Sequence, residues 1–143
     1  MPHQLYYEDI VVGSEITPLV KHPTKRQLVM WAGVSGDYYE IHYDKDFAQS
    51  KGLPGVIVQG QLAYSFLGQL MTDWIGEQGS LRKLTCSYKG MNFPGEPLVC
   101  KGKVSRKYVE DGEHYVACNI WAENVRGEKT ISGMAIVIMP SKG

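Results

Sequence analysis

The sequence predicts an α+β fold in which an antiparallel sheet wraps around one long central helix. Three observations predict it: a strong helical period between residues 62 and 75, a period of two after Gly79, and hairpin signals between the later apolar stretches. Helices and strands that are segregated along the chain in this way form a sheet packed on helices. The length of 143 residues suits one domain, and we treat residues 1–143 as that domain.

The first part of the chain predicts one extended segment and one helix. Gly13 and Ser14 open an extended stretch over residues 15–20. Thr24 and Gln27 have the spacing of a capping box, so we expect a helix that begins there and stops at Gly33 or Gly36. Residues 36–55 predict an irregular segment with only a short helical turn at 46–50. Long irregular segments in compact domains are usually functional.

The clearest helix follows this segment. Apolar residues recur every four positions, with further apolar residues beside them, and Gly76 ends the pattern. A stripe this wide belongs to a helix that is buried on most sides. The residues that recur every four positions are Leu62, Phe66, Leu70 and Trp74.

The last part of the chain predicts four strands. Residues 98–108 alternate between apolar and polar side chains, which is typical of a half-buried strand. Further strands are predicted at 84–91, 115–125 and 131–139. Asp111-Gly112 and Arg126-Gly127 are hairpin signals between the last three of these four strands.

The composition excludes several classes of protein. Fifteen basic residues balance fifteen acidic ones, whereas proteins that bind nucleic acid or anionic membranes through charge carry a basic surplus. We therefore expect no nucleic-acid or membrane partner, and a neutral chain opposes self-association least. Cys86, Cys100 and Cys118 lack the C-x-x-C spacing of zinc and redox sites and suit buried thiols in a reducing compartment. The N-terminus lacks the pattern of a signal peptide and no apolar stretch reaches 18 residues, so we expect a cytoplasmic protein.

Residues 35–44, with the sequence SGDYYEIHYD, contain the first candidate site. Asp37 and His42 cannot share one helical face, but a loop can aim both side chains at one point. A carboxylate and an imidazole aimed at one water molecule form a general acid–base pair. On spacing alone, a turn aspartate and a solvated loop histidine explain the same residues.

Gly60 is the second candidate, because it lies where the central helix begins. A glycine there offers a free backbone N–H, supported by the helix dipole, to an oxygen that develops negative charge. The alternative is a helix cap in a tight turn. Together, the two candidates suit proton transfer at a carbon next to a carbonyl or thioester, through an enolate-like state.

These residues resemble a known family, the MaoC-like dehydratases, which include the (R)-specific enoyl-CoA hydratases and the 3-hydroxyacyl-thioester dehydratases. The resemblance implies a hot-dog fold and a homodimer or higher homo-oligomer, with a heterodimer as the other option. It also implies a thioester of coenzyme A or acyl carrier protein as substrate, with no cofactor and no metal. It is carried by Gly36-Asp37, Ile41-His42, Asp44, Phe47, Ala48, residues 54–58, Gly60 and the later turn at 89–96.

Residue by residue, the resemblance implies that Asp37 and His42 are the catalytic pair and that Gly60 is the oxyanion donor. The pair would hold a water molecule, and the Gly60 N–H would bind the thioester oxygen. The implied activity is that of a hydro-lyase, which reversibly hydrates a trans-2-enoyl thioester or dehydrates the matching (R)-3-hydroxyacyl thioester. The chain has Tyr39-Glu40 where the family usually has Asn-Pro, and Gln59 where it commonly has His. We expect Tyr39 and Gln59 to line the substrate pocket and to retune specificity.

Two alternatives stay open. A hot-dog acyl thioesterase would need a nucleophile or carboxylate on the central helix, which offers mainly Gln61, Tyr64 and Gln69. The other alternative is a non-catalytic subunit that binds acyl thioesters in a heteromeric dehydratase. The replacement of Asn-Pro by Tyr39-Glu40 suggests it, although the retained acid–base pair argues against it.

Overall fold

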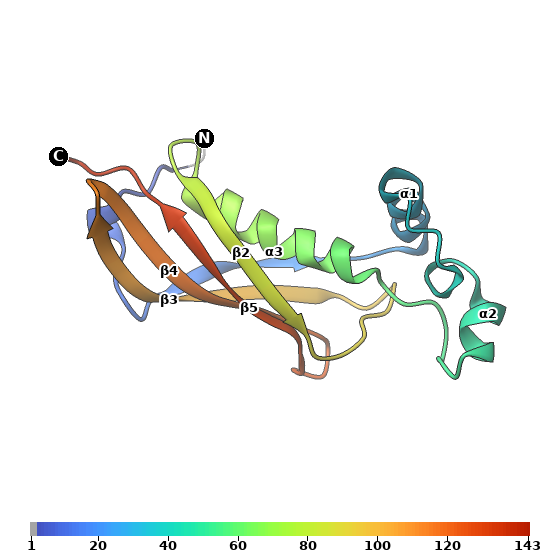
Figure 1. Ribbon diagram of the computed structural model, residues 1–143. Coiled ribbons are helices and arrows are strands. Elements are labelled where there is room, and N and C mark those ends of the chain that lie inside the picture. The colour runs from blue at the N-terminus through green and yellow to red at the C-terminus, as the bar shows by residue number, and fades with distance from the viewer. Residues whose placement is uncertain (1–2) are drawn as a thin grey trace.

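A five-stranded antiparallel sheet dominates the computed structural model, which describes residues 3–143 (Figure 1). The strand order is β1-β3-β4-β5-β2, so β1 and β2 are the two edges. The α+β prediction is confirmed. The strands are β1 (Glu15–Lys21), β2 (Ser80–Tyr88), β3 (Leu98–Glu110), β4 (Glu113–Glu123) and β5 (Lys129–Ile138).

The central helix, α3 (Gly60–Ile75), lies along one face of this sheet (Figure 1). It begins and ends where the sequence predicts. Its buried side chains form the middle of the core with the apolar residues of the strands, whereas its opposite face is exposed in the single chain. The buried residues of α3 are Leu62, Ala63, Phe66, Leu67, Leu70, Met71 and Ile75.

The irregular segment forms a small group of helices beyond one end of the sheet, next to the start of α3 (Figure 1). The irregular segment contains the 3-10 turn η2 (Glu40–His42) and α2 (Lys45–Ser50), and the predicted helix before it, α1 (Lys25–Ser35), belongs to the same group. A further 3-10 turn, η1 (Tyr7–Asp9), precedes β1. The Thr24 side chain accepts a hydrogen bond from the Gln27 N–H, which caps α1 as predicted. Gly36, with φ 77°, ends α1, so the helix continues through Gly33.

The hairpins of the sheet follow the predicted turns, and β2 differs from its prediction. Asp111 and Gly112 have φ values of 51° and 79°, the left-handed conformation that a two-residue hairpin requires. The predicted strand 84–91 instead runs from Ser80 to Tyr88, because Ser80 already pairs with Ile138 of β5. Exposed Arg82 and Lys83, together with a register shift between Leu81 and Lys83, interrupt the alternation that would have revealed the earlier start.

The two edges of the sheet differ in their backbone. β1 contains Pro18, which has no N–H, inside a register shift between Ile16 and Leu19. β2 contains no proline and pairs only with β5 within the described chain. Among residues 3–143, no helix is long and apolar enough to cross a membrane.

Candidate functional site

The orientation of the His42 ring is fixed by one backbone hydrogen bond. His42 is buried in η2, and its Nδ1 lies 2.8 Å from the Ile57 carbonyl oxygen. A carbonyl oxygen can only accept, so Nδ1 carries the hydrogen. In the neutral ring, Nε2 therefore has a free lone pair, and this is the form of histidine that can take a proton from a ligand.

Asp37 lies on the side of the ring where this lone pair is. Its Oδ2 is 3.9 Å from His42 Nε2, and its side chain is 44% exposed. The other carboxylate oxygen, Oδ1, accepts from the Tyr39 N–H at 3.4 Å, and the backbone N–H of Asp37 donates to the Ser35 hydroxyl at 3.2 Å. A gap of 3.9 Å is too long for a direct hydrogen bond, but one water molecule can bond to both groups.

The segment from Ile57 to Gln59 joins this pair to the central helix. Its backbone N–H groups donate to neighbouring segments. The Ile57 N–H donates to the Ile41 carbonyl at 3.1 Å, and the Val58 N–H donates to the Asn92 carbonyl at 2.8 Å. The buried Gln59 side chain donates through Nε2 to the Leu28 carbonyl of α1 at 2.7 Å. These bonds hold the segment between α1, η2 and the loop after β2.

Gly60, the first residue of α3, follows this segment directly. Three residues of extended chain span at most about 11 Å, which bounds the distance from the Ile57 Cα to the Gly60 Cα. The first N–H groups of an α-helix have no partner inside the helix. A side chain at Gly60 would place its Cβ 3.1 Å from the Tyr88 ring, so the glycine permits close packing of this tyrosine.

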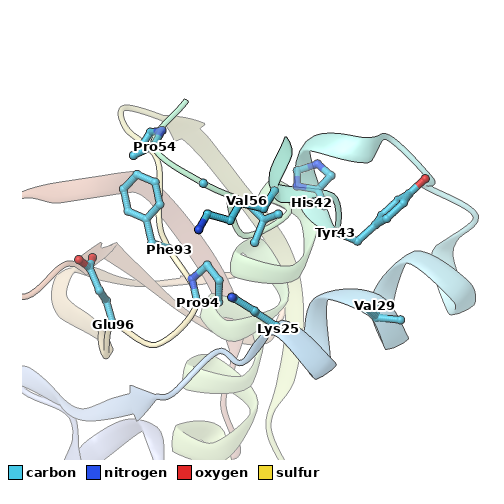
Figure 2. Close-up of a pocket in the computed structure, with 11 residues that line it drawn as sticks. Lys25, Val29, His42, Tyr43, Pro54, Val56, Phe93, Pro94 and Glu96 are labelled. Carbon is cyan, nitrogen blue, oxygen red and sulfur yellow. The ribbon is translucent and has the colours of Figure 1, made fainter. Parts of the chain in front are cut away.

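An open cleft of about 390 Å³ reaches His42 (Figure 2). Apolar side chains form most of its wall, with the charged residues Lys25, Lys45 and Glu96 around it. Asp37 and Gly60 do not line this cleft of the single chain. The complete lining is Lys25, Val29, His42, Tyr43, Lys45, Pro54, Gly55, Val56, Phe93, Pro94 and Glu96.

The two further residues predicted for the pocket have different surroundings. Tyr39 is half exposed and lies edge-on to His42, with the ring centroids 6.2 Å apart. Gln59 is 1% exposed, and its Oε1 has no hydrogen-bond partner in the described chain. Neither lines the cleft at His42, and their effect on specificity stays a prediction.

Sequence reasoning missed two groups. The Ile57 carbonyl, which orients His42, leaves no trace in the sequence because any residue can supply a backbone oxygen. Tyr88, which packs on Gly60, lay inside the predicted strand 84–91, and no signal in the sequence indicates a contact between residues 28 positions apart.

In the neutral form of His42, the arrangement therefore provides an imidazole nitrogen with a free lone pair and a carboxylate 3.9 Å away. The segment that ends at Gln59 leads directly into the N-terminus of α3. An imidazole and a carboxylate around one water molecule can move protons to and from a bound substrate. A free helix N–H can stabilise a developing oxyanion.

Comparisons with known proteins agree with this architecture. The sequence profile described as MaoC like domain matches residues 12–125. The unliganded R-hydratase PhaJ1 from Pseudomonas aeruginosa superposes with a TM-score of 0.87 at 21% identity, over 97% of this chain and 88% of that chain. The ChsH1-ChsH2 complex from Mycobacterium tuberculosis gives 0.79 at 19% identity, over 90% of this chain and 98% of that chain. These likenesses confirm the hot-dog fold.

One curated relative is much longer than this chain. The fatty acid synthase beta subunit TOXC from Cochliobolus carbonum is 33% identical over 73 residues, which are 50% of this chain and 4% of that protein. The chain spans about 4% of the length of the curated relatives it matches.

Proposed function

The chain belongs to the MaoC-like domain family, and from this membership we propose that it is a hydro-lyase acting on acyl thioesters. It would reversibly hydrate a trans-2-enoyl thioester of coenzyme A or acyl carrier protein and dehydrate the (R)-3-hydroxyacyl form. The observation that carries the proposal is the pairing of Asp37 with His42 at 3.9 Å, with His42 Nε2 on the carboxylate side.

In the proposed hydration, Asp37 and His42 hold the attacking water molecule. His42 Nε2 removes one proton while the water oxygen bonds to the β-carbon of the substrate. The electrons of the carbon–carbon double bond move toward the thioester and form an enolate-like state, whose oxygen accepts from the Gly60 N–H. The pair then returns a proton to the α-carbon on the same face, so the net change is the addition of one water molecule.

The first experiment tests activity and the catalytic pair together. The purified protein is mixed with crotonyl-CoA, and the ultraviolet absorbance of the conjugated thioester is followed while free thiol is measured in parallel. We expect loss of absorbance without thiol release. We also expect Asp37→Asn and His42→Ala to lower turnover at least 100-fold. General acid–base catalysis typically accelerates a reaction by about 10²–10⁴-fold.

Two exposed residues provide matched controls. Asp46→Asn removes a carboxylate from the first turn of α2, and His22→Ala removes a solvent-exposed imidazole. We expect both to keep wild-type turnover and all four variants to remain folded by circular dichroism. Wild-type turnover in Asp37→Asn or His42→Ala would remove those residues from the mechanism.

The same assay separates the alternatives. Thiol release would favour an acyl thioesterase, although α3 exposes amides and hydroxyls in its first two turns rather than a carboxylate. No reaction with any chain length would favour a non-catalytic subunit in a heteromeric dehydratase.

The proposal includes three further statements. The chemistry uses only protein groups, so we expect dialysis against a chelator to leave turnover unchanged.

We expect the purified chain to self-associate, and sedimentation analysis would measure this. A monomer would favour assembly with a different partner chain. We also propose a cytoplasmic location, because Cys86, Cys100 and Cys118 are unpaired thiols.

A further inference from the structure

The side chain of Tyr88 is packed against the start of the central helix. A Cβ built on Gly60 would lie 3.1 Å from Tyr88 Cε1 and Cζ and 3.5 Å from its hydroxyl oxygen. The hydroxyl end of the ring is therefore the part that covers Gly60. The phenol therefore lies beside the residue that carries the first N–H of α3.

The position of Tyr88 is also accessible from outside. Tyr88 is the last residue of β2 and is 54% exposed. It lines an open groove of about 580 Å³ along the start of α3, together with Trp31, Gln61 and Tyr64. A ligand in this groove can therefore contact the Tyr88 side chain.

Among residues 3–143, the Tyr88 hydroxyl donates to no oxygen acceptor. The neighbouring Tyr64 differs, because its hydroxyl donates to the Leu84 carbonyl. The polar neighbour of the Tyr88 hydroxyl is the Cys86 thiol, which is a weak hydrogen-bond partner. Partial burial of the Tyr88 ring, followed by the nearby Cys86, raises the pKa of Tyr88 to about 12, so the hydroxyl keeps its proton at neutral pH.

We propose that the Tyr88 hydroxyl is a second hydrogen-bond donor to the thioester carbonyl oxygen, beside the Gly60 N–H. This inference rests on the proposed hydro-lyase function and adds a residue to it. Two donors that converge on one oxygen stabilise the enolate-like state more than the neutral carbonyl, because the charge on that oxygen grows as the reaction proceeds. Tyr88 would lose no proton in this role.

Tyr88→Phe tests the proposal, because it keeps the ring over Gly60 and removes only the hydroxyl. We expect kcat with crotonyl-CoA to fall at least tenfold, against the roughly 10²–10³-fold that a lost oxyanion donor costs. We expect KM to change less than twofold, because the interaction gains strength in the transition state. Tyr108→Phe is the matched control, since Tyr108 stacks on Tyr115 near the β3–β4 turn, and its kcat should equal that of the wild type.

Two outcomes would overturn the inference. A Tyr88→Phe variant with wild-type kcat would show that only the ring matters. An equal loss of kcat in Tyr108→Phe would show a general effect of removing tyrosine hydroxyls.

A second measurement separates this inference from the proposed function. Acetoacetyl-CoA forms an enolate with its own ultraviolet band, and oxyanion donors increase that band on binding. If the wild-type protein does not hydrate crotonyl-CoA, the proposed function fails, but a band that weakens in Tyr88→Phe and not in Tyr108→Phe still supports Tyr88 as a donor. A band of equal strength in the wild type and Tyr88→Phe overturns the Tyr88 assignment whatever the turnover.

Discussion

At the scale of the residue, Gln59 shows how one buried amide connects the parts of the site. Its Nε2 donates to Leu28 of α1, which is the helix that leads to Asp37, and the next residue begins α3. The bond therefore fixes the acid-bearing segment relative to the proposed oxyanion donor. Only an amide or another donor of that length can make it, because the acceptor is a buried carbonyl.

Gln59→Glu should make the stability of the protein depend on pH. Burial raises the pKa of a carboxyl group above its unfolded value. The protonated form can still donate to Leu28, so stability should be close to wild type near pH 4. As the pH rises through the raised folded pKa, the free energy of unfolding should fall, because the unfolded state then binds fewer protons. Thermal melts between pH 4 and 8 would measure this.

Gln61→Glu is the control for this change, since Gln61 is exposed two residues further along. Its free energy of unfolding should not fall relative to the wild type as the pH rises, because the helix dipole favours a carboxylate in the first turn of α3. Equal pH profiles for the two variants would show that the Gln59 bond does not stabilise the fold.

At the scale of the element, the contact between β2 and β5 depends on a glycine. A Cβ on Gly133 would overlap the Thr85 carbonyl of β2 and lie 2.8 Å from the Cys86 Cα. Both clashing atoms belong to the backbone of β2, so no change of side-chain rotamer can relieve the overlap. Gly133→Ala should therefore lower the free energy of unfolding by about 1–3 kcal/mol, the usual cost of overpacking.

Gly33→Ala provides the opposite case. Gly33 lies inside α1, and a Cβ there meets nothing within 4 Å. Alanine should stabilise the helix by roughly 0.5–1 kcal/mol. Denaturant titrations of both variants measure the two signs. A Gly133→Ala protein as stable as the wild type would mean that β2 can move away from β5 without cost.

The sequence predicted the elements better than their contacts. The α3 period, the Thr24 cap and the Asp111-Gly112 turn are local signals, and the structure confirms all three. The start of β2 was wrong because its pairing with β5 is not local. Likewise, the spacing of Asp37 and His42 suggested a pair, but the tautomer of His42 depends on the backbone of Ile57 and the cover of Gly60 depends on Tyr88.

At the scale of the whole molecule, buried thiols make the fold sensitive to alkali. Burial raises the pKa of Cys100 and of Cys118 from 9.0 to about 12. At a pH between 9 and 12, these two thiols lose their protons in the unfolded chain but keep them in the folded chain. The free energy of unfolding should therefore fall as the pH rises above 9, by up to about 1.4 kcal/mol per pH unit for each thiol.

A double variant isolates this effect. With Cys100→Ala and Cys118→Ala together, the melting temperature should fall less steeply between pH 9 and 11 than it does in the wild type. Iodoacetamide should label the half-buried Cys86 of the folded protein before it labels the other two. Equal slopes for the wild type and the double variant would exclude the thiols as the source of alkaline instability.

The unequal edges of the sheet limit how copies of this molecule can add to one another. Pro18 and the register shift in β1 remove the regular row of N–H groups that an incoming strand needs. The β2 edge has a register shift only near its start, between Leu81 and Lys83, and its N–H groups from Lys83 to Tyr88 are uninterrupted by proline. A filament can grow by strand addition only if every subunit has two edges that can each pair with another subunit. If each subunit has one such edge, that edge is already paired once two subunits have associated. Strand addition in this protein should therefore terminate at a pair and not seed fibres, even at high concentration.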